Sequence, residues 1–172
     1  MRRSSLWIVA SCGAFAGAVL AFAQAHQKPG LYEVTTVMTW QHSPFPEGMP
    51  GMPNLASAMG GPHTMQVCVT QAQIEKYGGP LPQSRNNECQ ASNVKRSANG
   101  MTADWVCNGN MKGKGTIESN WTDENHSTSK VHFTGTMQMG PEAKPVEWTN
   151  ESTSTFKGAD CGSVKPAPLS KE

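Results

Sequence analysis

The second half of the chain alternates between apolar and polar residues, and turn-forming residues interrupt the alternation at intervals. A period of two places the apolar side chains of a strand on one face of a sheet and the polar ones on the other. Five runs of this kind follow one another, at residues 89–96, 101–107, 111–121, 127–139 and 146–157. Short segments containing Asn, Gly and Asp separate them, so the order predicts antiparallel strands joined by turns.

The first half of the chain adds two strands and one helix. Residues 31–40 alternate with Tyr32 and Trp40 on one face, and residues 63–70 form a shorter apolar run. Thr70 and Gln73 have the spacing of a capping box, which predicts a helix at residues 71–77 that ends at the glycines after it. The pattern therefore predicts an all-β domain of about 7 strands, an antiparallel meander sheet that is either backed by the helix or curled into a small barrel.

Large aromatic residues recur on the predicted buried faces. If the domain holds an internal binding site, they are the candidates to line it, and a site built from them would take a small apolar ligand. The same residues also suit an ordinary hydrophobic core, so both interpretations stay open. The candidates are Tyr32, Trp40, Trp105, Trp121, Phe133 and Trp148.

A basic pair and a long apolar segment stand at the beginning of the chain. Arg2 and Arg3 precede an uncharged stretch at residues 6–23, which ends in small residues at alternating positions, as signal peptidase requires. We expect residues 1–25 to be a secretory signal peptide that is removed after Ala23 or Ala25. The mature protein would then lie in an oxidising compartment without a stable membrane anchor.

A lipoprotein is the alternative for this segment. Cys12 follows small residues of the kind that precede a lipidated cysteine. Most of the apolar stretch would then follow Cys12, whereas a lipoprotein signal carries its apolar segment before the cysteine. This favours the cleaved signal peptide.

Residues 26–161 are long enough for one domain with a modest core, and we expect a flexible tail at 162–172. Of the 14 Lys and Arg residues, Arg2 and Arg3 would leave with the signal peptide, so 12 basic residues would stand against 13 acidic ones. A nearly neutral domain has no electrostatic attraction for nucleic acid, which excludes that class of partner.

Four of the five cysteines lie in the mature segment, and an even number in an exported chain predicts two disulfides. If the turn before the fourth strand holds four residues, Cys89 lies opposite Asn108, one residue from Cys107. A Cys89–Cys107 bond then needs little rearrangement, and Cys68 would pair with Cys161. Spacing alone allows three pairings, so the connectivity stays open.

Residues 42–62 are rich in Met, Pro and Gly, and we expect them to form a mobile loop. Thioether sulfur and imidazole are ligands that Cu(I) prefers. An alternative function is therefore periplasmic copper binding through Met49, Met52, Met59, His63 and Met65.

Several short motifs in this chain resemble a family of bacterial secreted proteins catalogued as domain of unknown function 3617. The resemblance covers residues 28–161, and the cysteines with their neighbours are its most specific part. It implies a periplasmic protein with disulfides and no known activity, and Tyr32 stands where family members more often carry Trp. The motifs are Lys28-Pro29-Gly30-Leu31-Tyr32-Glu33-Val34, Met49-Pro50-Gly51-Met52-Pro53, Gln66-Val67-Cys68-Val69-Thr70, Cys89, Trp105-Val106-Cys107, Gly113-Lys114-Gly115 and Asp160-Cys161.

The sequence contains no nucleophile elbow and no paired-histidine zinc helix. We therefore expect a non-enzymatic binding or interaction module without a cofactor, whose partner is a small apolar ligand or another protein. An enzyme whose site matches no recognisable motif is the remaining alternative.

Overall fold

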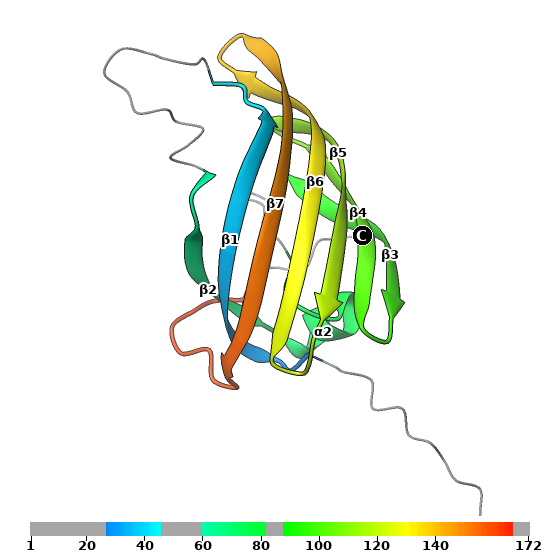
Figure 1. Cartoon of the computed structure of the whole chain (residues 1–172), viewed down its shortest axis with the longest axis vertical. Coiled ribbons are helices and arrows are strands. Elements are labelled where there is room, and N and C mark those ends of the chain that lie inside the picture. Colours follow the sequence, from blue (N-terminus) through cyan, green and yellow to red (C-terminus); the bar gives the residue numbers. More distant parts are fainter. Residues whose placement is uncertain (1–26, 46–59, 82–87, 167–172) are drawn as a thin grey trace, which may run out of the picture.

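The computed structural model describes residues 27–45, 60–81 and 88–166. They contain seven strands, which form one antiparallel sheet in the order β2-β1-β7-β6-β5-β4-β3 (Figure 1). The elements are β1 (Gly30–His42), β2 (His63–Val69), α2 (Gln71–Tyr77), β3 (Cys89–Ser97), β4 (Gly100–Asn108), β5 (Met111–Trp121), β6 (His126–Met139) and β7 (Glu142–Gly158).

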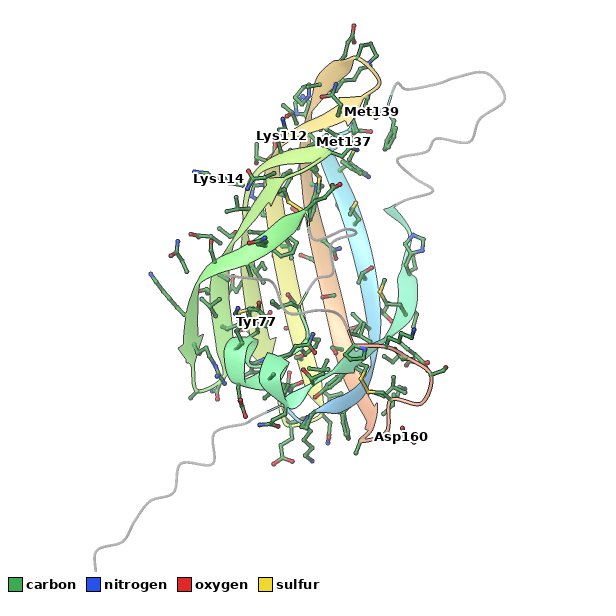
Figure 2. The ribbon with its side chains drawn as sticks, turned by 180° about the vertical axis from the view of Figure 1, so that it is seen from behind. Tyr77, Lys112, Lys114, Met137, Met139 and Asp160 are labelled. Carbon is green, nitrogen blue, oxygen red and sulfur yellow. A yellow bond between two sulfur atoms is a disulfide. The ribbon has the colours of Figure 1, made fainter. Side chains whose placement is uncertain are left out.

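The sheet is strongly curved but not closed. Strands β3 to β7 form a meander, whereas β1 pairs with both β7 and β2. Strands β2 and β3 are the two edges, and α2 lies against the concave face between them, as the view from behind shows (Figure 2). The predicted antiparallel sheet with one short helix is confirmed; of the two forms considered, the open sheet is observed and the barrel is not.

The last strand begins earlier than the alternation predicts. Gly140 and Pro141 form a tight turn between Met139 and Glu142, which pair with each other. The ladder then includes Pro145, which has no N–H to donate. At this position β7 pairs with β6 alone, because β1 joins β7 only from Glu147 onward. The free side of the strand accommodates the proline.

The buried side chains form two clusters. The larger lies on β3 to β7 and contains ring stacking between Phe133 and Trp148, whose centroids are 5.3 Å apart. The smaller joins the sheet to α2 through Tyr32, Val69 and Ile74. The larger cluster consists of Cys89, Met101, Ala103, Trp105, Cys107, Ile117, Trp121, Val131, Phe133, Val146 and Trp148.

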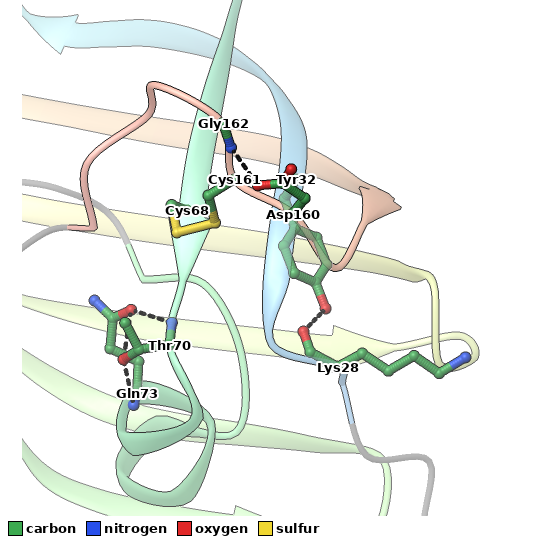
Figure 3. The surroundings of a disulfide bond; sticks show 8 residues. All are labelled: Lys28, Tyr32, Cys68, Thr70, Gln73, Asp160, Cys161 and Gly162. Carbon is green, nitrogen blue, oxygen red and sulfur yellow. Dashed lines mark hydrogen bonds between the residues drawn. A yellow bond between two sulfur atoms is a disulfide. The ribbon is translucent and has the colours of Figure 1, made fainter.

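Both disulfides have the connectivity favoured by the hairpin argument. Cys89 is bonded to Cys107 within the β3–β4 hairpin, and Cys68 to Cys161 across a separation of 93 residues (Figure 3). The second bond fastens the segment after β7 to the edge strand β2. It therefore joins the two halves of the chain.

No helix within 27–45, 60–81 or 88–166 is long and apolar enough to cross a membrane. The predicted signal peptide and Cys12 belong to residues 1–26, which lie outside the described ranges.

Candidate functional site

The concave face of the sheet carries a row of hydroxyl groups among its apolar side chains. Thr36 on β1 pairs with Ser152 on β7, which pairs with Ser129 on β6, which in turn pairs with Ser119 on β5. Four adjacent strands therefore each place one hydroxyl at the same level of the sheet.

A second, shorter row lies beside the first. Ser154 on β7 pairs with Ser127 on β6, and the two are flanked by Val34 on β1 and Trp121 on β5. We call the two rows together the hydroxyl band. Its members are Thr36, Ser119, Ser127, Ser129, Ser152 and Ser154, and all of them line one cavity.

The hydrogen bonds within the band do not include the buried hydroxyl of Ser154. The Oγ atoms of Ser119 and Ser129 are 3.0 Å apart, and the Ser152 hydroxyl donates to the Ser129 carbonyl oxygen over 3.5 Å. Ser154 is only 6% exposed, and its Oγ has no hydrogen-bond partner. A buried hydroxyl without a partner is unfavourable, so the Ser154 side chain would gain a hydrogen bond by turning toward a molecule bound in the cavity.

The cavity above the band has a volume of about 140 Å³ and walls that are mainly apolar. They come from three parts of the fold: the concave face itself, the edge strand β2, and the segment that follows α2. The apolar side chains of the walls are those of Val34, Met65, Val67, Tyr77, Pro80, Leu81, Met101, Trp121 and Val131.

The caps of α2 place the segment that covers the cavity. At its beginning, the Thr70 side chain accepts a hydrogen bond from the Gln73 N–H, and the Gln73 side chain accepts one from the Thr70 N–H (Figure 3). At its end, Gly78 is left-handed with φ of 86° and donates to the Ile74 carbonyl oxygen. These are the predicted capping box and glycine stop.

Gly78 also permits close contact with the sheet. A Cβ atom at this position would lie 2.3 Å from a ring carbon of Trp121. The turn after α2 therefore rests directly on the indole, which is itself part of the cavity wall. Any side chain at residue 78 would push this cover away from the sheet.

Among the lining residues that the structure describes, none is charged, and the phenol of Tyr77 is the one titratable group. The other tyrosine, Tyr32, is fully buried in the smaller cluster, and its hydroxyl donates to the Lys28 carbonyl oxygen over 2.6 Å. Burial raises the pKa of Tyr32 to about 12, because the ionised phenol would lose its hydration. Tyr32 therefore stays neutral at physiological pH.

The structure separates the six aromatic residues proposed from the sequence as site residues. Trp121 is the one of the six that lines the cavity. Trp105, Phe133 and Trp148 belong to the larger cluster and Trp40 packs against it. Tyr32 belongs to the smaller cluster.

The hydrophobic pattern did not reveal the hydroxyl band, because serine counts as polar. The information was nevertheless present in the spacing. Ser119 lies two residues before Trp121, which was predicted to lie on a buried face, so both side chains point to the same side of β5. Ser127, Ser129, Ser152 and Ser154 follow the same rule on β6 and β7. Inward-facing serines within a predicted apolar face would have indicated a polar cavity.

The copper hypothesis stays a prediction. Met49, Met52 and Met59 lie outside the described residues. His63 and Met65 lie on β2, where both side chains are exposed and Met65 also borders the cavity. Within the described part of the chain, no group of three or more His, Cys, Asp or Glu side chains could hold a metal ion.

The fold and the cavity define a small, disulfide-bonded protein in which an open, curved antiparallel sheet and a capped helix enclose a neutral pocket. Its sequence matches a family model over residues 27–161, which is most of the chain. The chain thus belongs to the family described as "Protein of unknown function (DUF3617)". Comparison with curated proteins and with solved structures gave no match.

Proposed function

We propose that this protein is an exported, non-enzymatic binding module that holds a small molecule in the cavity above the hydroxyl band. The observation that carries the proposal is the unpartnered, buried Ser154 hydroxyl in the lining of an otherwise apolar cavity. Binding sites commonly combine apolar walls with a few polar groups that orient the ligand.

The size of the cavity supports a ligand smaller than a typical cofactor. A cavity of roughly 150 Å³ takes a benzene-sized molecule, whereas drug-sized ligands occupy about 300 to 1,000 Å³. At about 140 Å³, this cavity fits a single ring or a chain segment of similar volume. Larger molecules would have to project out of it.

The proposed location is the bacterial periplasm. Two disulfides favour an oxidising compartment, because the cytoplasm keeps thiols reduced. The amino-terminal segment has the order of a cleaved signal peptide. Both features agree with export, after which the domain would meet ligands in the space outside the inner membrane.

The composition of the cavity favours binding over catalysis. A serine nucleophile needs a neighbouring base, usually histidine, to remove its proton. The serines of the band have other hydroxyls and apolar side chains as neighbours, and the described part of the cavity lining contains no His, Asp, Glu or Lys. They are therefore suited to hydrogen bonding with a ligand.

A fragment screen with a filled-cavity variant tests the proposal. Ser152→Leu places a larger side chain in the middle of the cavity, and Thr153→Leu puts the same side chain on the exposed face of the same strand. We expect small molecules to shift the backbone amide resonances of cavity residues in the natural protein and in Thr153→Leu, but not in Ser152→Leu. Circular dichroism would confirm that both variants fold. Absence of saturable shifts at the cavity, or equal shifts in Ser152→Leu, would contradict the proposed function.

A further inference from the structure

The lining of the cavity limits the charge of the ligands that the cavity can bind. The lining residues that the structure describes carry aliphatic, thioether, aromatic, hydroxyl and amide side chains, and none of them carries a carboxylate, ammonium, guanidinium or imidazole group. Transfer of an unpaired ion into such a site is strongly unfavourable, since nothing replaces its hydration. Anions and cations would therefore be rejected.

The hydroxyl band favours a ligand with a polar group over a purely apolar one. The Ser154 Oγ is already buried without a partner, and an apolar molecule would leave it so while removing any water that reaches Ser127 beside it. A ligand with its own hydroxyl or carbonyl group would satisfy the Ser154 hydroxyl. The side-chain amide of Asn150, next to the band on β7, offers both a donor and an acceptor.

The rest of the lining suits an apolar body attached to that polar group. Trp121 on β5 and Leu81 after α2 supply apolar surface, and Val67 and Met65 add to it from β2. A ligand can thus be apolar over most of its surface while one polar group faces the band.

We infer that the ligand is a neutral amphipathic molecule of about one six-membered ring in size, with a hydroxyl or carbonyl group that hydrogen-bonds to Ser154. This inference rests on the proposed function, since it names the chemical class that the same cavity binds. The Ser154 hydroxyl orients the ligand, and the apolar walls supply the burial that holds it.

Three probes of similar size test this class: benzyl alcohol, toluene and benzoate. Each is titrated into the isotopically labelled protein while the amide resonances of cavity residues are followed. We expect benzyl alcohol to bind about five- to tenfold more tightly than toluene, as one net hydrogen bond allows, and benzoate to bind more weakly than either. In Ser154→Ala, the affinity for benzyl alcohol should fall by the same factor while that for toluene stays unchanged. Thr153→Ala, on the opposite face, is the matched control and should bind all three as the natural protein does.

The possible results test the ligand class and the proposed function separately. If toluene or benzoate binds as tightly as benzyl alcohol, or if Ser154→Ala leaves the preference intact, the ligand class is wrong and the cavity remains a binding site. If no probe shifts the cavity resonances in a saturable way, the ligand class is overturned. If the fragment screen also gives no response that Ser152→Leu removes, the proposed function fails as well.

Discussion

Cys89 lies directly opposite Cys107 in the β3–β4 ladder, although an uninterrupted hairpin would place Asn108 there. The difference arises from a bulge: Ser92 pairs with Asp104, but Lys95 pairs with Thr102. Two residues of β3 therefore oppose one residue of β4, which moves the register by one position. This shift aligns the two cysteines.

The bulge depends on the backbone of Asn93. Its φ of 50° is left-handed, and its side-chain amide donates to the Asp104 carboxylate over 2.6 Å. A β-branched residue is disfavoured in this conformation, so Asn93→Val should lower the free energy of unfolding by about 1–3 kcal/mol. Ser92→Val, at the adjacent exposed position, is the control and should change it by less than about 0.5 kcal/mol. Urea denaturation measures both, and equal effects would show that the left-handed backbone is unimportant.

The two disulfides should contribute unequally to stability. The Cys68–Cys161 bond closes a loop with a separation of 93 residues, whereas Cys89–Cys107 spans 18. In the chain-entropy model, the longer loop contributes about 4–5 kcal/mol and the shorter about 3 kcal/mol. Replacement of each pair by serine, followed by denaturation of the two double variants, measures this difference. A larger loss for the Cys89–Cys107 pair would mean that hairpin geometry outweighs loop entropy.

Two serines of the hydroxyl band should respond oppositely to truncation when no ligand is bound. Ser119→Ala removes the hydrogen bond to Ser129 and should lower the free energy of unfolding by about 1 kcal/mol. Ser154→Ala removes a buried hydroxyl that has no partner, so it should be neutral or stabilising by up to about 1 kcal/mol. Thermal denaturation of the two variants tests the contrast. A clear loss of stability in Ser154→Ala would indicate that this hydroxyl is already satisfied.

Tyr32 should make stability depend on pH in the alkaline range. Its pKa is raised from 10.0 to about 12 in the folded protein, because burial penalises the phenolate. Below pH 10 the phenol is neutral in both the folded and the unfolded chain. Between pH 10 and 12 only the unfolded chain ionises, so the free energy of unfolding should fall as the pH rises through this range.

The variant Tyr32→Phe isolates this effect. It should flatten the alkaline loss of stability and remove the phenol that ionises near pH 12 in an ultraviolet titration. At neutral pH it should cost about 1 kcal/mol through the lost hydrogen bond to Lys28. An unchanged alkaline profile in this variant would assign the effect to another group.

The alternation of apolar and polar residues was sufficient to predict the strands. It correctly placed Trp121, Phe133 and Trp148 on the buried face, because side chains in a strand alternate strictly between the two faces. The capping residues of the helix were equally clear, since Thr70 and Gln73 interact with each other and with the adjacent backbone. These features depend on local geometry, which a single sequence reveals.

The sequence could not show which strands become neighbours. Pairing of β1 with both β2 and β7 brings together residues that lie far apart in the chain, and no local pattern encodes it. The sequence did not reveal the bulge at Asn93 either. One extra residue in β3 shifts the pairing with β4, but it hardly disturbs the apolar and polar alternation within β3 itself. The early start of β7 was also hidden. Pro145 fits into this strand because β1 ends before it reaches that position, so that β7 has a hydrogen-bonding neighbour on one side only.

An all-β domain with one capped helix, a nearly neutral charge and cysteines suited to two disulfides follow from the order of the residues. The open sheet, and the cavity that Ser154 and Ser127 line beneath the turn after α2, become visible in the folded chain. They were hidden because burial of a serine is not an intrinsic property of that residue. It depends on which strands pair and on what covers their common face, and both arise from contacts between distant parts of the chain.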